Sequence, residues 1–139
     1  MKINVEGSQV LDNESFAKVL HSALEIEDRV DREKEHFWVA GLDGKHRIKY
    51  LDLVSLGDLN SSIASPREVF RRAIMEGAFA IIVGHNHPTG NATPSSQDMT
   101  ITRRLKEGGE LLGINLLDHV VIGNDSGSFQ SIREIENAA

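Results

Sequence analysis

The chain has 139 residues and no cysteine, and its 15 basic and 21 acidic residues give a formal net charge of −6. This length suits one domain with a real hydrophobic core, and an acidic chain without a Lys/Arg block is a poor candidate for strong autonomous binding to nucleic acid or to an anionic membrane. Without thiolates, any metal must be held by nitrogen and oxygen atoms.

The first half of the chain predicts one helix and a β-hairpin. Asn13 is a candidate cap for a helix whose apolar residues recur with helical spacing, and the charged stretch Glu25–Glu35 is typical of a solvated helix end. We expect strands over 37–42 and 47–54, because both are apolar and the turn signal Asp43-Gly44 separates them. The first ten residues resemble no targeting segment, and no apolar run approaches the roughly 18 residues of a membrane span, so a soluble cytoplasmic protein is expected.

The second half predicts alternating helices and strands. Ser65-Pro66-Arg67-Glu68 favours a helix start with serine as the cap and glutamate closing a capping box, and Gly77 would end that helix. The remaining expected elements are a buried strand over 78–83, a helix over 95–112, a strand over 114–122, a turn over 124–127 and a short strand over 129–132. This order predicts an α/β sandwich, with helices packed on a mixed β-sheet.

A metal-binding pattern lies where the buried strand runs into the next helix. His85 and His87 are two residues apart, so their imidazoles point to the same side of an extended chain, and Pro88 favours that extended conformation. Asp98 falls in the first turn of the helix, where the helix dipole favours the ionised carboxylate that a metal requires. Two imidazoles and one carboxylate suit zinc and leave a fourth position open for water, as in catalytic sites.

These residues also have simpler interpretations that do not involve a metal, and a polar loop can carry a His-x-His pair by chance. Ser95-x-x-Asp98 is a plain capping box, which would account for both residues. His119, beside Asp118 in an apolar strand, is either a residue that orients a ligand by a hydrogen bond or an ordinary core histidine. The other three histidines, His21, His36 and His46, are expected at the surface.

The same residues resemble the JAMM/MPN metalloprotease family, whose motif is an upstream glutamate followed by His-x-His-x7-Ser-x2-Asp. The chain matches this motif with no departure in spacing at His85, His87, Ser95 and Asp98. The string HNHPTGNATPSSQDMTITRRLKEGGELLGINLLDHVVIG, with LNSSIASPREVFRRAI upstream, resembles the bacterial RadC-type branch, although Thr89 stands where serine is usual. The resemblance implies a cytidine-deaminase-like sandwich over residues 31–139, preceded by a helical extension over residues 1–30.

The resemblance also implies a role for each matched residue. His85, His87 and Asp98 would bind Zn²⁺, and Ser95 would steady the oxyanion that forms during hydrolysis. The general base of the family is a glutamate that directly precedes the first apolar strand. Glu35, in Glu35-His36-Phe37-Trp38-Val39, fits this position.

Two other glutamates compete with Glu35 for the role of general base. Glu33 is the local rival, because it lies in the same charged stretch two residues upstream. Glu68, at the start of the helix predicted after Ser65, is the more distant one. The simplest alternative for Glu35 itself is one more solvated charge.

Three functions remain open at this point. The leading one is a zinc-dependent peptidase or isopeptidase that acts on an unidentified peptide or protein. The RadC-type name implies DNA repair, so a metal-dependent nuclease is the second, although only a short helix precedes the domain and we expect no built-in DNA-binding module. The third is a metal-binding scaffold without activity, which retention of every ligand disfavours. The sequence indicates no oligomeric state.

Overall fold

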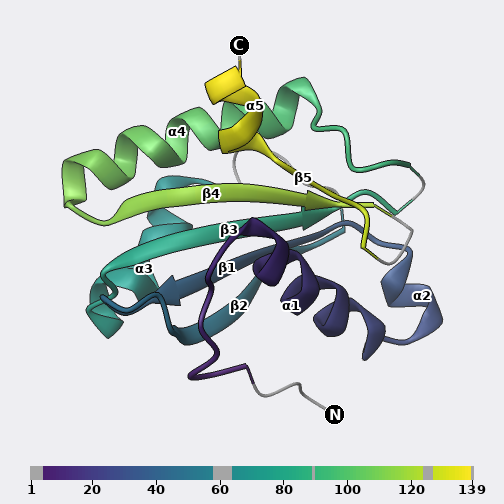
Figure 1. The fold of residues 1–139 in the computed structure, drawn as a ribbon, viewed down its shortest axis with the longest axis horizontal. Helices are drawn as coiled ribbons and strands as arrows, with labels where there is room; N and C mark the ends of the chain where they lie inside the picture. The colour runs from purple at the N-terminus through teal and green to yellow at the C-terminus, as the bar shows by residue number, and fades with distance from the viewer. Residues whose placement is uncertain (1–4, 58–63, 89, 124–126, 139) are drawn as a thin grey trace.

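The computed structural model describes residues 5–57, 64–88, 90–123 and 127–138 and shows a five-stranded mixed sheet with helices on both faces (Figure 1). The elements are α1 (Asn13–Glu25), α2 (Arg29–Arg32), β1 (His36–Leu42), β2 (Ile48–Leu56), α3 (Pro66–Glu76), β3 (Ala80–Asn86), α4 (Ser96–Leu112), β4 (Asn115–Ile122), β5 (Phe129–Ser131) and α5 (Ile132–Ala138). The strand order is β2-β1-β3-β4-β5, with β3 and β4 parallel and the other neighbours antiparallel. The predicted α/β sandwich with a mixed sheet is confirmed.

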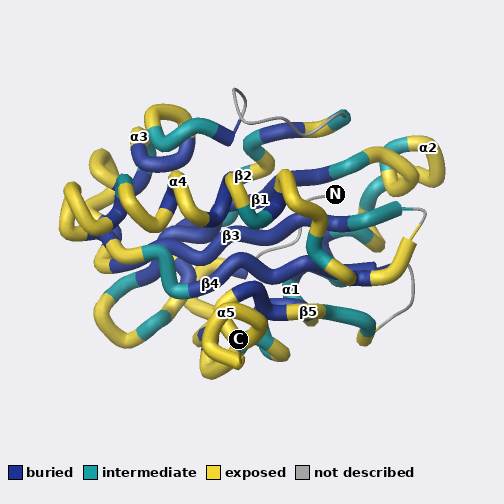
Figure 2. The backbone as a smooth tube through the Cα atoms, turned by 90° about the horizontal axis from the view of Figure 1, so that it is seen from above, coloured by how far each residue is buried: buried dark blue, intermediate teal, exposed yellow. Residues whose placement is uncertain are grey.

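The two faces of the sheet carry separate hydrophobic clusters. Alternate side chains of β1, such as Trp38, pack against α1, whereas Phe37 and Val39 pack against α3 and α4 on the other face. Because both faces are covered, every residue of β1 and β3 is buried, and Figure 2 shows these strands in the interior. None of the described helices combines the length and the apolar character that crossing a membrane would need.

A glycine allows α1 to lie close to β3. A Cβ atom added to Gly84 would lie 2.3 Å from Cδ1 of Leu20, which belongs to the buried face of α1. Any larger residue here would push the helix away from the strand. This close contact supports the strand from one side immediately before His85.

The helix ends partly differ from the predictions. Asp12, not Asn13, caps α1, because its carboxylate accepts a hydrogen bond from the Ser15 amide. The predicted capping box at α3 is wrong: Ser65 makes no side-chain capping hydrogen bond, and Glu68 pairs with Arg71 at 3.1 Å. Pro66 in the first turn and the left-handed Gly77, with φ of 64°, still bound this helix as expected.

Two short helices were not predicted from the sequence. α2 lies in the charged stretch before β1, and Asp28 accepts a hydrogen bond at its first turn. α5 follows β5 and begins where a strand was expected to continue, because the side chain of Ser131 accepts a hydrogen bond from the Glu134 amide. Most of the predicted turn over 124–127 lies outside the described residues, as does Thr89.

Candidate metal centre

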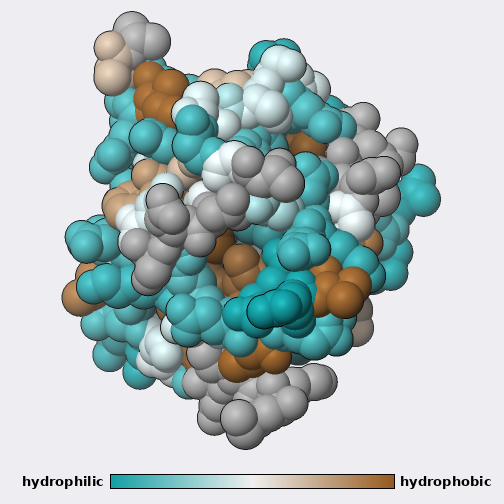
Figure 3. All heavy atoms as spheres, turned by 90° about the vertical axis from the view of Figure 1, so that its right-hand side faces the viewer, coloured by the Kyte–Doolittle hydropathy of each residue, from teal (hydrophilic) through white to brown (hydrophobic). Residues whose placement is uncertain are grey.

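The candidate ligands gather where β3 ends and α4 begins, on the side of Figure 1 toward which β3 and β4 run. His85 is the penultimate residue of β3, and the backbone amide of His87 continues the pairing with β4 by donating to the Ile122 carbonyl at 2.9 Å. The chain then crosses a short loop and enters α4, whose third residue is Asp98. Figure 3 shows this end of the molecule, which is mainly hydrophilic.

Asp98 joins the two predicted histidine ligands. Its Oδ1 lies 2.9 Å from Nδ1 of His85, and its Oδ2 lies 3.0 Å from Nε2 of His87. His85 and Asp98 are almost completely buried, whereas the His87 side chain keeps 18% of its surface exposed. The structure therefore brings His85, His87 and Asp98 together, with one member of the group open to solvent.

Asp98 is held in its ionised form. Burial acts to raise the pKa of Asp98, but hydrogen bonds from His85, His87 and the Ser95 amide outweigh it and hold the pKa well below the usual range. The pKa of His87 is raised, mainly because its ring donates a hydrogen bond to the Asp98 carboxylate. The ionised carboxylate of Asp98 is the form in which this side chain binds a divalent cation.

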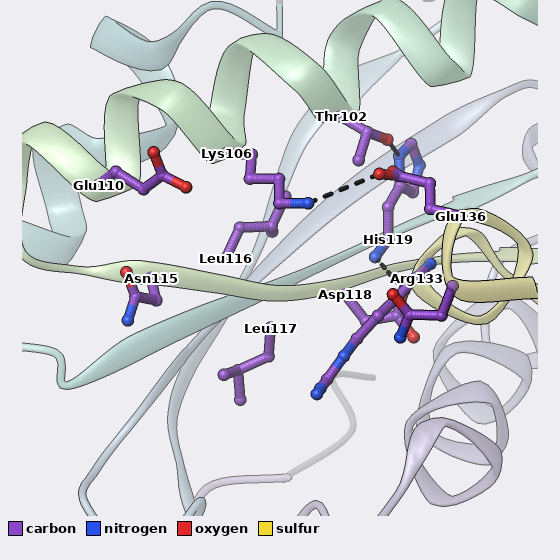
Figure 4. A pocket seen from close by; sticks show the side chains of 11 residues that line it. Thr102, Lys106, Glu110, Asn115, Leu116, Leu117, Asp118, His119, Arg133 and Glu136 are labelled. Carbon is purple, nitrogen blue, oxygen red and sulfur yellow. Dashed lines mark hydrogen bonds and ion pairs between the residues drawn. The ribbon is translucent and has the colours of Figure 1, made fainter. Parts of the chain in front are cut away.

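His119 on β4 also faces this group. The Thr102 hydroxyl donates to the Asp98 carbonyl at 2.8 Å, so its oxygen accepts from Nδ1 of His119 at 2.8 Å (Figure 4). The proton of the neutral ring is therefore on Nδ1, and Nε2 carries a lone pair. Burial lowers the pKa of His119 to about 3, so the ring is neutral at physiological pH.

The donor atoms fit a transition-metal ion. His85, Asp98 and His119 each offer a ligand atom, and these atoms lie within 4.8 Å of one another, so this group could bind a metal ion. Among the described residues, Nε2 of His85 and Nε2 of His119 are both buried without a hydrogen-bond partner. Imidazole nitrogen and carboxylate oxygen are donors that zinc and its neighbours accept. A cation would give these lone pairs a partner.

Two sets of three candidate ligands share His85 and Asp98 and differ in the third residue. The third residue is His119 in the group that the structure brings together, and it is His87 in the sequence motif. His119 is fully buried, whereas His87 is part-exposed and lies in direct contact with the Asp98 carboxylate. Of the two histidines in question, His87 is the one that reaches solvent.

Glu35 is the only one of the three candidate glutamates that the structure places beside the group. Its Oε1 lies 3.9 Å from Nε2 of His85, and 39% of its side-chain surface is exposed. Glu33 ends α2 and is exposed, and Glu68 is exposed on α3 in the pair with Arg71. The carboxylate of Glu35 thus borders both the buried histidine and solvent.

Ser95 forms the capping box that the sequence predicts. Its Oγ accepts from the Asp98 amide at 3.1 Å, and its own amide donates to Oδ2 of Asp98 at 2.8 Å. The box therefore fixes the carboxylate that the two histidines share. Accepting this bond leaves the hydroxyl proton of Ser95 available for a further acceptor.

Comparison with known proteins assigns the family, because the sequence profile of the RadC-like JAB domain matches residues 11–137. The chain belongs to the RadC-like JAB domain family. The family predicted from the His-x-His-x7-Ser-x2-Asp motif is confirmed.

Curated relatives support the same assignment. A UPF0758 protein of Geotalea uraniireducens is 56% identical over 101 residues, which cover 73% of this chain and 43% of the relative. UPF0758 proteins of Geobacter sulfurreducens and Desulfitobacterium hafniense are 54% identical over 94 residues and 47% identical over 107, covering 68% and 77% of this chain and 41% and 46% of the relatives. The chain spans less than half the length of these relatives. Their names state no activity.

Sequence reasoning missed two residues of this RadC-like JAB domain. His36, predicted at the surface, is buried: its ring stacks on Trp38 with centroids 5.0 Å apart, and its Nδ1 donates to the Lys34 carbonyl. Asn86, the middle residue of His85-Asn86-His87, was given no role, yet it is buried and bonds to both Lys34 and His36. Its place between two same-side histidines on a strand was the available signal, because alternate residues face opposite ways.

A groove of about 370 Å³ lies next to the metal centre but is distinct from it. It runs between α4, β4 and α5, and Figure 4 shows Lys106 and Glu136 on its rim with Thr102 and His119 at one end. Neither His85 nor Asp98 is among its lining residues. The groove thus touches the group only through His119.

Proposed function

We propose that this RadC-like JAB domain is a metallohydrolase that cleaves amide bonds in a peptide or protein, with Zn²⁺ held by His85, His87 and Asp98. One observation carries the proposal. An ionised, buried carboxylate is shared by two imidazoles, and a second, part-exposed carboxylate, Glu35, lies 3.9 Å from one of these imidazoles. Candidate ligands with a carboxylate base beside them are the arrangement that metal-assisted hydrolysis needs.

The protein residues have separate tasks in this reaction. A zinc ion bound here would lower the pKa of a water molecule and polarise the scissile carbonyl. Glu35 would take a proton from the attacking water and pass it to the leaving amine, and its partial exposure lets its carboxylate reach both. Ser95 would donate its hydroxyl proton to the developing oxyanion, while its oxygen stays fixed by the Asp98 amide.

His119 supports this arrangement from the buried side. Its Nδ1 is committed to Thr102, which also bonds to the Asp98 backbone, so one hydrogen-bond chain links β4 to the first turns of α4. We propose that His119 fixes the position of Asp98 and keeps a neutral nitrogen facing the metal. Replacing a residue that orients a metal ligand typically lowers metal affinity by about 10- to 100-fold.

The deciding experiment has two steps. Elemental analysis of protein purified without added metal should show about one zinc per chain, the occupancy expected of a single three-ligand site. The zinc-loaded protein is then incubated with a mixed peptide library, isopeptide-linked peptides and single-stranded DNA. We expect cleavage of one of the amide substrates, and a rate lower by roughly 100-fold or more with Glu35→Gln.

The other outcomes separate the competing functions. Zinc-dependent cleavage of DNA without amide cleavage would replace the proposal with a nuclease. Stoichiometric zinc with neither activity would indicate a metal-binding scaffold. The net charge of −6 favours the amide substrate, because few basic groups are available to hold a phosphate backbone. We also place the protein in the cytoplasm, in keeping with its lack of cysteine.

A further inference from the structure

The side chain of Asn86 holds the backbone on both sides of Glu35. Its Oδ1 accepts a hydrogen bond from the His36 amide at 2.5 Å, and its Nδ2 donates to the Lys34 carbonyl at 3.0 Å. The partners define the orientation of the amide, since an N–H needs an oxygen and a carbonyl needs an N–H. Asn86 is 1% exposed, so water does not compete for these bonds.

The Asn86 side chain takes the place of backbone pairing between β1 and β3, which ends one residue earlier. The antiparallel ladder between β1 and β3 ends at Phe37 opposite His85, and the next residue of β3 is Asn86. The chain then turns, because the amide of His87 bonds to Ile122 on the other neighbouring strand. The Asn86 side chain therefore continues the hydrogen bonding between β3 and the segment before β1, from His36 to Lys34 on the far side of Glu35.

The peptide units around Glu35 are restrained at three consecutive residues. The Lys34 carbonyl accepts from Asn86 and from Nδ1 of His36, the Glu35 carbonyl accepts from the Gly57 amide at 2.9 Å, and the His36 amide donates to Asn86. These hydrogen bonds hold the Cα atom of Glu35, and its side chain extends from there toward His85. Restraint of the backbone matters because a glutamate side chain has three rotatable bonds, and a shift of its Cα atom would displace the carboxylate further.

We propose that Asn86 is the positioning residue for Glu35. His85 and His87 face the metal, and the residue between them faces the opposite way and aims the general base at the same centre. This inference rests on the proposed hydrolase function. Misplacing a catalytic group by about 1 Å can cost on the order of 100-fold in rate, so the effect of losing these two bonds is large enough to measure.

The competing possibility is that Asn86 only stabilises the end of the sheet. Ser131→Ala provides the matched control, because Ser131 is a buried polar residue at the end of the edge strand β5, and its hydroxyl donates to the Asp118 carboxylate and accepts from the Glu134 amide. Both Asn86→Ser and Ser131→Ala remove buried hydrogen bonds and should lower the melting temperature. Only Asn86→Ser should affect Glu35.

The first measurement needs no substrate. In zinc-loaded crystals of Asn86→Ser, we expect the Glu35 carboxylate to leave its single position beside His85 while His85, His87 and Asp98 stay in place. Exchange of the His36 amide, followed by NMR, should accelerate at least 10-fold, on the order expected for a lost buried hydrogen bond. An unmoved Glu35 carboxylate would overturn the proposal, whatever the hydrolase assay shows.

The second measurement uses hydrolysis of the peptide substrate found with the wild-type enzyme. Asn86→Ser should lower kcat on the order of 10- to 100-fold with KM and zinc content nearly unchanged. In a Glu35→Gln background it should lower kcat no further, because the residue that it aims is already disabled. An equal loss in both backgrounds would show that Asn86 acts through something other than Glu35.

A second variant covers the case in which Asn86→Ser does not fold. Asn86→Asp keeps the volume and the acceptor for the His36 amide, but it replaces the donor to the Lys34 carbonyl with a carboxylate oxygen and adds a buried charge. It should keep the slow exchange of that amide and show a smaller displacement of Glu35. If the wild-type protein hydrolyses nothing, the proposed function fails, and the Glu35 position in these crystals still decides whether Asn86 holds that residue.

Discussion

Two buried aspartates, Asp98 at the start of α4 and Asp118 on β4 beside the start of α5, behave in opposite ways. Asp98 accepts from two imidazoles and one backbone amide, and its pKa falls despite burial. Asp118 accepts from the Ser131 hydroxyl and from the amides of His119 and Arg133, yet burial dominates and raises its pKa. For Asp98 the hydrogen bonds from two imidazoles and one amide outweigh burial, whereas for Asp118 the hydroxyl and amide donors and the charge of Arg133 do not.

This difference separates a candidate site from a structural cap. Each aspartate is hydrogen-bonded to the serine that directly precedes a helix, Ser95 for α4 and Ser131 for α5. In the described part of the chain, the Asp98 carboxylate contacts two imidazole rings, and a second carboxylate, Glu35, lies 3.9 Å from one of them. The same local capping chemistry therefore serves two purposes, and the neighbours from other strands decide which.

The largest expected effect is loss of the metal. His85→Ala combined with His87→Ala should abolish binding of about one zinc per chain, because two of three ligands are removed. Elemental analysis after gel filtration measures this. Ser131→Ala, which disturbs the Asp118 cap instead, should keep its zinc. Retention of stoichiometric zinc by the double variant would mean that the metal sits elsewhere, and binding through His119 would then be tested next.

The next effect concerns the general base. Glu35→Gln keeps the shape of the side chain but cannot accept a proton, so hydrolysis should fall by roughly 100-fold or more with zinc retained. Initial rates on the peptide substrate, with zinc content measured on the same samples, give the comparison. Glu33→Gln is the matched control, because Glu33 is an exposed neighbour, and it should remain close to wild type. Equal losses in both variants would remove Glu35 from its assigned role.

The two capping serines allow a direct test of the comparison itself. Ser95→Ala and Ser131→Ala should each cost about 1 kcal/mol of unfolding free energy, as loss of a helix cap usually does. Only Ser95→Ala should also lower the rate, on the order of 100-fold, because its hydroxyl is proposed to serve the oxyanion. Chemical denaturation and initial rates separate the two. A fully active Ser95→Ala enzyme would leave the capping box as the complete account of Ser95.

The smallest effect is the pH dependence of stability in metal-free protein. The pKa of folded Asp98 lies below its ordinary value of 3.8, so its stabilising contribution is complete above that value and is lost as the pH falls below it. The pKa of Asp118 is raised, so its ionisation opposes folding and stability falls as the pH rises through that pKa. Compared with wild type, Asp98→Asn should therefore lose less unfolding free energy as the pH falls below 3.8. Asp118→Asn should not show the decrease in unfolding free energy that ionisation of Asp118 causes as the pH rises above 3.8. Urea titrations between pH 3 and 7 measure both, and identical curves for the two variants would contradict the contrast.

Local signals in the chain predicted most elements and the motif. Proline at the first turn of α3, the left-handed Gly77 and the apolar runs of β1 and β3 act over a few residues, so they can be recognised before folding. Short elements were missed: α2 and α5 have too few residues for a periodic pattern, and hydrogen bonds to Asp28 and Ser131 start them. The cap expected at Ser65 failed because a suitable sequence does not guarantee the side-chain geometry.

The sequence by itself determined that His85, His87, Ser95 and Asp98 come together, because they lie within one strand, loop and helix start, where spacing dictates which side each residue faces. Tertiary structure alone decided what meets this segment. Glu35 arrives from the end of α2, His119 from the parallel neighbour β4, and Asn86 turns the other way to hold the backbone beside Glu35. These contacts join residues 17 to 52 positions apart. No local rule sets such distances, because they depend on how the strands are ordered in the sheet.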